Sequence, residues 1–179
     1  DVSIGDSIAV NGVCLTVTQL VDNSFSADVS QETLNCSTFS QLKKGQNINL
    51  EKSLRLDQGI DGHLVSGHVD GVGKVISIAI EGESTCMKIK VDDNLVKYIA
   101  KKGSICINGV SLTVNEIDDN VFGVNIVPHT FSVTTLDELK VNSQVNLEID
   151  IIARHIEQLL NHKTSAGIDK ALLIKNGYL

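Results

Sequence analysis

Two short segments of this sequence place a nucleophile-type side chain just after a tight turn. Residues 10–17 read Val-Asn-Gly-Val-Cys-Leu-Thr-Val, and residues 107–114 read Ile-Asn-Gly-Val-Ser-Leu-Thr-Val. Because alternate residues of a strand point to the same face, Cys14 shares a face with Thr16, and Ser111 shares one with Thr113. Cysteine and threonine are also ordinary residues of barrel strands. Recurrence of the pattern favours a chemical role but leaves the structural alternative open.

A third segment, residues 62–71, combines two histidines with three glycines. Histidine is the side chain best suited to proton transfer near neutral pH, and glycine lets a ligand or another backbone approach closely. His68 is therefore a candidate for proton transfer; the alternative is a hydrogen-bonded structural residue. A metal site is not expected, because no third ligand stands at a suitable spacing.

The two strand motifs belong to an internal repeat with an offset of 97 residues. Over residues 10–51, 16 of 42 positions are identical to the residue 97 positions later. This period is too long for a solenoid, whose units have about 20–50 residues. The repeat therefore predicts two duplicated domains.

Both copies are predicted to consist of short β-strands separated by Asn-Gly or Asp-Asn turns. Strands at roughly 8–12-residue spacing in a unit of about 90 residues indicate a small Greek-key barrel. Helices are expected at residues 94–101 and 153–162, the second with Ile156, Leu159 and Leu160 on one face. The expected strands are residues 8–10, 15–18 and 25–29 in the first copy and 105–107, 112–114 and 122–127 in the second.

Composition and charge exclude several function classes. The net charge is −7 and aromatic residues make up 3% of the 179 residues, which argues against binding a nucleic acid backbone or stacked bases. No apolar run approaches the roughly eighteen residues of a membrane helix, and no signal-peptide pattern opens the chain. The four cysteines are scattered, without a Cys-x-x-Cys pair, so we expect reduced thiols and a cytoplasmic protein.

Five motifs together resemble the riboflavin synthase family, whose members are trimeric two-barrel enzymes that end flavin biosynthesis. They lie in the family's order and spacing between Gly5 and His162 and read NGVCLTV, GHLVSGHVDGVG, KKGSICINGVSLTV, VPHTFSVTTL and VNLEIDIIARHIEQLL. The resemblance implies an all-β fold of two tandem homologous six-stranded Greek-key barrels followed by a C-terminal α-helix. It divides the chain into an N-terminal barrel (1–60), a C-terminal barrel (61–150), a trimerisation helix (151–162) and a tail (163–179).

The family's reaction consumes two molecules of 6,7-dimethyl-8-ribityllumazine. One molecule donates a four-carbon unit to the other, giving riboflavin and 5-amino-6-ribitylamino-pyrimidinedione without a metal or redox cofactor. The resemblance implies a homotrimer whose active sites lie between the N-terminal barrel of one subunit and the C-terminal barrel of the next. Helix 153–162 is then the trimer contact, the alternative being that it folds back on its own barrel. Association with lumazine synthase is a further partner that the resemblance suggests.

Two other function classes compete with this assignment. A non-catalytic lumazine- or flavin-binding protein of the same fold would keep the barrels and lose the catalytic side chains. A purely structural barrel would bind neither lumazine nor flavin. The chain retains the five residues that match the family's catalytic positions, and this favours the enzyme.

The resemblance assigns roles residue by residue. The matched catalytic positions are Cys14, His68, Ser111, Thr113 and Asp150. Cys14 and His68 resemble the nucleophile and proton-transfer candidates, and which group is the true nucleophile or base stays open. The matched substrate-binding positions are Cys14, Leu15, Thr16, Asp28, Val29, Ser30, Gln31, Glu32, Thr33, Gly67, His68, Val69, Lys102, Ser111, Leu112, Thr113, Asn125, Ile126, Val127, Pro128, His129 and Thr130.

The two copies differ in their reactive groups and in their completeness. Reactive positions are unlike, as a donor site and an acceptor site would require: Cys14 matches Ser111, Glu32 matches His129, and Ser53 matches Asp150. The second copy also has a strand-like lead-in over residues 64–80, whose counterpart would lie before Asp1. The family's opening Met-Phe-Thr-Gly belongs to that counterpart. A chain that begins at Asp1 is expected to have unpaired strand edges, impaired stability and little activity.

Overall fold

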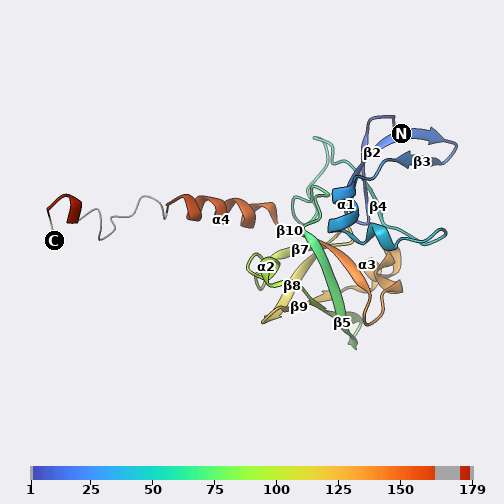
Figure 1. The fold of residues 1–179 in the computed structure, drawn as a ribbon. Helices are drawn as coiled ribbons and strands as arrows, with labels where there is room; N and C mark the ends of the chain where they lie inside the picture. The colour runs from blue at the N-terminus through green and yellow to red at the C-terminus, as the bar shows by residue number, and fades with distance from the viewer. Residues whose placement is uncertain (1, 164–173, 178–179) are drawn as a thin grey trace.

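The computed structural model describes residues 2–163 and 174–177, so most of the expected tail (163–179) lies outside the described residues. The first half contains β1 (Ser7–Val10), β2 (Val13–Val21), β3 (Ser24–Ala27), α1 (Gln31–Cys36), the 3-10 helix η1 (Thr38–Gln41) and β4 (Leu50–Lys52). The second contains β5 (Gly71–Glu81), β6 (Ser84–Lys90), α2 (Asp93–Val96), β7 (Ser104–Ile107), β8 (Val110–Asp118), β9 (Val121–Ile126), α3 (Pro128–Val133), the 3-10 helix η2 (Thr135–Glu138), β10 (Gln144–Ile149) and α4 (Ile151–Lys163). Figure 1 shows the two halves next to each other, with α4 extending away from both. Within the described ranges, every helix is too short or too polar to cross a membrane.

The second half is a closed barrel, and the first half is an open sheet. The barrel order is β10-β5-β6-β9-β8-β7, and the open sheet has the order β3-β2-β1-β4. A shift of 97 residues matches β1 to β4, with their intervening helices, to β7 to β10. β5 and β6 have no counterpart among the described residues of the first half, so β3 and β4 are its edges. The mostly β fold, the repeat and the six-stranded second barrel are confirmed.

Two hairpin turns of the same sequence begin the equivalent strands β2 and β8. Asn11 and Gly12 have φ angles of 45° and 78°, and Asn108 and Gly109 have φ angles of 48° and 85°. Positive φ at both central residues characterises a type I′ turn, for which Asn-Gly is a preferred pair. Alternation along β2 then directs three apolar side chains into the core of the first half and leaves Cys14 on the opposite face.

Several predicted element boundaries differ from the structure. The strands expected at 15–18 and 112–114 are longer, as β2 and β8. The helix expected at 94–101 is the single turn α2, because the backbone continues in tighter i to i+3 bonds, such as that from Tyr98 N to Leu95 O (3.0 Å). The strand expected at 25–29 ends at Ala27, since Ser30 caps α1 by accepting a hydrogen bond from Thr33 N (3.1 Å). The lead-in at 64–80 becomes a strand only at Gly71.

Four asparagines join the two halves in a pseudo-twofold arrangement. Asn49 Nδ2 donates to the Asn108 carbonyl (2.9 Å), and its repeat equivalent Asn146 donates from Nδ2 to the Asn11 carbonyl (2.8 Å). Within each half the pattern also repeats, because Asn49 N donates to Asn11 Oδ1 and Asn146 N donates to Asn108 Oδ1. Asn11, Asn108 and Asn146 are buried, so these bonds satisfy groups that water does not reach.

The same asparagines hold the start of each 3-10 helix in the opposite half. Thr38 N donates to Asn146 Oδ1 (2.7 Å), and Thr135 N donates to Asn49 Oδ1 (2.8 Å). The two turns also touch, since a Cβ added at Gly12 would lie 2.7 Å from Gly109 N. Close backbone packing and paired side-chain bonds therefore fix how the halves sit against each other.

Substitution of Asn146 by alanine should weaken this contact and the fold. The change removes one buried and one part-buried hydrogen bond and leaves Thr38 N and the Asn11 carbonyl unpaired. This should lower the free energy of unfolding by about 1–3 kcal/mol. Chemical denaturation measures the loss. Asn94→Ala, at an exposed position of α2, is the control and should change stability little. Equal stability of the two variants would contradict the role of Asn146.

Candidate functional site

Cys14 and Ser111 occupy equivalent places in two rows of side chains. Strand register places Ser111 opposite Cys106, and Cys106 opposite Glu148. In the first half the corresponding row is Cys14, Ala9 and Glu51. Residues directly opposite on neighbouring strands point to the same face. Each candidate nucleophile is therefore two strands away from a glutamate on the outer face of its sheet or barrel.

The environments of the cysteines differ in a way that bears on reactivity. Burial, and then the charge of Glu148, raises the pKa of the Cys106 thiol to about 12. Cys106 is therefore a protonated, buried thiol near neutral pH, whereas Cys14 is half-buried. Because the thiolate is the nucleophilic form of cysteine, Cys14 is the better placed of the two for covalent chemistry.

The segment of residues 62–67 runs between the two rows and contacts both of them. At one end His63 Nδ1 and Ser111 Oγ form a hydrogen bond of 2.7 Å. At the other end the carbonyl of Gly67 accepts a hydrogen bond from Cys14 N (2.8 Å). A Cβ at Gly67 would lie 2.6 Å from the Cys14 Cβ, and its φ is +79°. Glycine is thus required there both by space and by backbone conformation.

His63 is the functional candidate that the sequence reasoning missed. Its Nε2 atom is buried and has no hydrogen-bond partner among the described residues. Burial lowers the pKa of His63, against the opposing effect of the Asp150 and Glu148 carboxylates, so the imidazole is neutral near pH 7. A neutral imidazole bonded to a hydroxyl can accept its proton. The histidine-glycine segment was recognised in the sequence, but only His68 was singled out; His68 is exposed.

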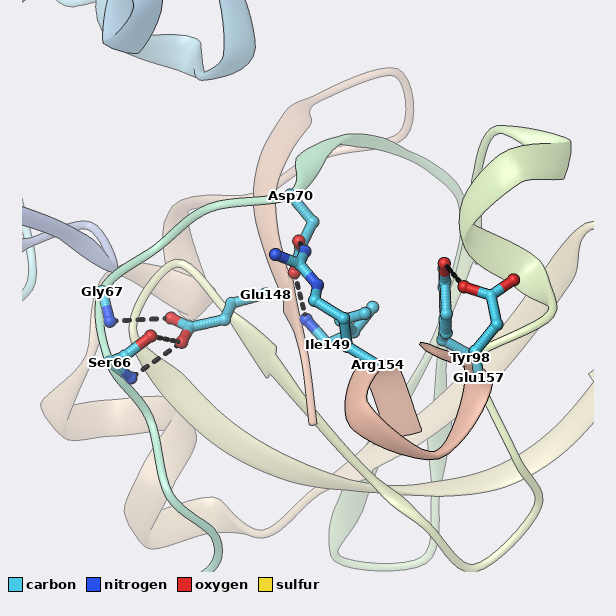
Figure 2. A network of polar contacts seen from close by, with 8 residues as sticks. All are labelled: Ser66, Gly67, Asp70, Tyr98, Glu148, Ile149, Arg154 and Glu157. Carbon is cyan, nitrogen blue, oxygen red and sulfur yellow. Dashed lines mark hydrogen bonds and ion pairs between the residues drawn. The ribbon is translucent and has the colours of Figure 1, made fainter. Parts of the chain in front are cut away.

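The backbone of the 62–70 segment is tied to the end of β10 by two carboxylates (Figure 2). Glu148 accepts hydrogen bonds from Ser66 N (2.7 Å), Ser66 Oγ (2.6 Å) and Gly67 N (2.9 Å). In the reverse direction, Asp70 Oδ2 accepts from Ile149 N (2.7 Å). The two carboxylates thus accept from backbone N–H groups that, in a β-sheet, would bond to a neighbouring strand.

Asp150 stands at the junction of β10 and α4. Its Oδ1 accepts a hydrogen bond from Ile152 N (2.9 Å), which satisfies one of the open N–H groups at the start of α4. Figure 2 shows the first turns of α4 against the barrel, where Arg154 pairs with Asp70 and Glu157 accepts from Tyr98. The base of α4 is thus fixed, and Asp150 with it, close enough to His63 to influence its pKa.

The other predicted binding residues of the second half lie on the strands and turns next to Thr113. Lys102 N donates to the Val114 carbonyl (2.7 Å), and Val114 is paired with Val124. Thr113, Lys102 and Asn125 therefore lie on adjacent stretches of backbone. Pro128 begins α3 directly after this stretch.

The matching residues of the first half lie where β3 passes into α1. Ser30 and Thr33 cap this helix, and Glu32 Oε1 accepts a hydrogen bond from Cys36 Sγ (3.1 Å). Two predicted binding residues, Leu15 and Ile126, are buried in the cores, so only their backbone could touch a substrate. Within the described part of this chain, no hydrogen bond or ion pair joins Asp28–Thr33 or Asn125–Thr130 to Cys14 or Ser111.

Two adjoining clefts, each of about 690 Å³, open beside Ser111. Both are lined by Glu51, Asp61 and Ser111, and one also includes His63. Volumes of this size suit a small-molecule ligand. Among the described residues, no group of three or more His, Cys, Asp or Glu side chains converges as metal ligands would.

Comparison with known proteins identifies relatives over the whole described fold. The family described as "Lumazine binding domain" matches residues 1–53 and 66–150. The riboflavin synthase of Photobacterium phosphoreum is 46% identical over 100% of this chain and 84% of its own length. The riboflavin synthase of Actinobacillus pleuropneumoniae is 48% identical over 91% of this chain and 76% of its own length. The riboflavin synthase of Bacillus subtilis (strain 168) is 39% identical over 99% of this chain and 85% of its own length.

Solved structures give the same relationship in three dimensions. LumP complexed with riboflavin has a TM-score of 0.76 and 31% identity, covering 83% of this chain and 80% of that one. LumP complexed with 6,7-dimethyl-8-(1'-D-ribityl) lumazine has a TM-score of 0.74 and 30% identity, covering 83% of this chain and 79% of that one. The fold is therefore shared with proteins that hold a lumazine or a flavin.

His63 should make stability depend on pH in a defined direction. Its pKa in the folded protein lies below the ordinary value of 6.5, so the unfolded chain takes up the proton first as the pH falls. The stabilisation is present above about pH 6.5 and is lost as the pH falls through the lowered pKa. Urea unfolding between pH 8 and pH 5 should show a smaller pH dependence for His63→Gln than for the wild type. His155→Gln, on an exposed part of α4, should retain the wild-type dependence; the same retention in His63→Gln would contradict the assignment.

Proposed function

The chain belongs to the riboflavin synthase family of lumazine-binding proteins, and from this premise we propose how its residues carry the reaction. Its function is that of a riboflavin synthase. This transferase reaction moves a four-carbon unit between two molecules of 6,7-dimethyl-8-ribityllumazine and yields riboflavin and 5-amino-6-ribitylamino-pyrimidinedione.

The observation that carries the proposal is the pair of equivalent rows ending in Cys14 and Ser111. A reaction between two copies of one molecule needs two similar binding surfaces, and the duplicated strands β2 and β8 supply them. The rows end in different nucleophile-type groups, as a donor and an acceptor require. Holding two reactants in a productive geometry can contribute several kcal/mol to catalysis, on the order of 7–11 in favourable model systems.

The catalytic roles follow from what each group can do with a proton or an electron pair. We assign nucleophilic addition to Cys14 and Ser111, and proton transfer to His68 on the exposed side of the 62–70 segment. Neutral His63, bonded to Ser111 Oγ, accepts the hydroxyl proton as Ser111 adds to a lumazine ring. Thr113 and Asp150 orient the second substrate molecule.

Substrate binding uses both halves. Asp28 and Glu32 accept hydrogen bonds from ribityl hydroxyls next to Cys14–Thr16, and Gly67–Val69 offers backbone groups. In the second half, backbone edges at Leu112 and along Asn125–Thr130 pair with the pyrimidine ring, as they would with another strand. Lys102, whose backbone N donates to the Val114 carbonyl, provides a positive charge to this part of the site.

Assembly completes the site in this proposal. The N-terminal unit (1–60) of one subunit faces the C-terminal barrel (61–150) of the next in a homotrimer. The stripe of α4, defined as Ile152, Ile156, Leu159 and Leu160, is exposed in the single chain, and α4 extends away from its own barrel (Figure 1). This arrangement supports a contact with other subunits. A cytoplasmic location, and association with lumazine synthase as the source of substrate, belong to the same proposal.

A non-catalytic lumazine- or flavin-binding protein is the second candidate, because the fold matches that of LumP. The identity to curated riboflavin synthases, 39–48% in the three described above, exceeds the identity of 30–31% to LumP. The enzyme is therefore favoured.

Incubation with 6,7-dimethyl-8-ribityllumazine should produce the absorbance of riboflavin. Exchange of the two nucleophile candidates, Cys14→Ser with Ser111→Cys, should lower turnover by at least about tenfold, since the two groups differ in nucleophilicity and pKa. Ser40→Cys, an exposed position in η1, controls for an added thiol. Unchanged turnover in the exchanged variant would refute distinct donor and acceptor sites. Tight lumazine binding by the wild type without riboflavin formation would instead identify the carrier.

Leu159→Asp should dissociate the trimer, because it places a charge in the apolar stripe of α4. The neighbouring variant Gln158→Asp adds the same charge at an exposed polar position and should leave the assembly intact. Light scattering in solution measures the change from a three-chain to a one-chain mass. A trimer that persists in Leu159→Asp would refute the assignment of α4.

A further inference from the structure

We propose that Glu148 is a positioning residue that fixes Cys14 and His68 within their own chain. It does so by holding the backbone of Ser66 and Gly67 against β10. This inference rests on the proposed site, and it assigns a role to a carboxylate that neither the repeat nor the family motifs single out.

The contacts of Glu148 are unusually complete for one side chain. Its carboxylate accepts from two consecutive backbone N–H groups and from the Ser66 hydroxyl, at 2.6–2.9 Å. The residue is 4% exposed. Buried carboxylates are costly unless they are hydrogen-bonded, and hydrogen bonds to a charged acceptor are stronger than those between neutral groups. The Ser66–Gly67 backbone is therefore held firmly although it belongs to no strand.

Gly67 in turn contacts Cys14 directly. The Gly67 carbonyl accepts from Cys14 N (2.8 Å), and the two residues are so close that no Cβ fits at position 67. A shift of Gly67 would consequently move Cys14 or break this bond. His68 is the next residue in the chain, so its backbone is set by the same anchor.

Glu148 also belongs to the row of side chains that ends in Ser111. Glu148 is opposite Cys106, and Cys106 is opposite Ser111, within the closed barrel. One carboxylate thus links the row that ends in Ser111 to the segment that holds Cys14. Because the proposed site joins Cys14 of one subunit to Ser111 of the next, Glu148 sets the place of each group within its own chain, without contacting the reacting atoms.

The repeat offers an internal comparison. Glu51 is the equivalent of Glu148 by the offset of 97 residues, and it occupies the same place in its row, opposite Ala9. Glu51 is exposed, whereas Glu148 is buried under residues 66–67. By the same offset the equivalents of Ser66 and Gly67 would lie before Asp1, so the two glutamates share a strand position and only Glu148 has its covering segment among the given residues.

Glu148→Gln is the decisive variant. Glu148 Oε1 accepts both bonds from Ser66, and Oε2 accepts only the bond from Gly67. Glutamine therefore keeps its acceptor on Ser66 and turns its Nε2 donor toward Gly67 N, so the Gly67 bond is lost and replaced by a repulsive contact. We expect kcat to fall by roughly tenfold or more, because small misplacements of catalytic groups cause losses of this size. KM should change much less. The Gly67 amide proton should also move upfield in the NMR spectrum, because its bond to a carboxylate is lost.

Two further variants separate positioning from folding. Ser66→Ala removes one of the three bonds and leaves both backbone donors bound, so its kcat should fall between the wild type and Glu148→Gln. Glu83→Gln removes a carboxylate from the exposed β5–β6 turn and should leave kcat unchanged. If Glu148→Gln does not fold, graded loss of kcat in folded Ser66→Ala supports the proposal, and wild-type kcat there overturns it.

The outcomes distinguish this proposal from the function on which it rests. Wild-type kcat in folded Glu148→Gln, or an unshifted Gly67 amide, overturns the positioning role while the synthase activity stands. Loss of activity in proportion to loss of folded protein also overturns it. A wild-type protein that forms no riboflavin refutes the assigned function, and the Gly67 amide shift still reports whether Glu148 holds the segment.

Discussion

The rest of the structure depends on the contact between the two halves, in which paired asparagines exchange hydrogen bonds around the touching turns of Gly12 and Gly109. Because Asn49 and Asn146 are equivalent in the repeat, each half donates to the other in the same way. A shift of one half would break four hydrogen bonds at once, two to the Asn11 and Asn108 carbonyls and two from Thr38 N and Thr135 N. The rows that end in Cys14 and Ser111 are adjacent to these turns, so the contact also fixes the site.

The segment of residues 62–67 contacts both candidate nucleophiles. His63 bonds to Ser111 Oγ, and the Gly67 carbonyl accepts a hydrogen bond from Cys14 N. A duplicated fold alone would give two like pockets. In the proposed function, the unlike groups at equivalent positions, Cys14 and Ser111, provide the difference that a reaction between a donor and an acceptor of the same substance requires.

Local sequence predicted much of the fold. The Asn-Gly turns force a type I′ hairpin, and the alternation that follows decides which residues of β2 and β8 enter the core. The offset of 97 residues held through every element that the two halves share. Boundaries failed where tertiary contacts decided them. Burial of Ile99 in the barrel core draws the chain after α2 into tight turns, and this cannot be read from the helical spacing of residues 94–101.

The sequence by itself determined the duplicated architecture and, through the family resemblance, the reaction and most of the candidate residues. The tertiary structure alone decided which of them share an environment. His63 became a candidate because burial lowers its pKa beside Ser111, and Glu148 because its three hydrogen bonds come from residues more than eighty positions away in the chain. Such roles depend on burial and on long-range hydrogen bonds, which no local pattern of residues specifies.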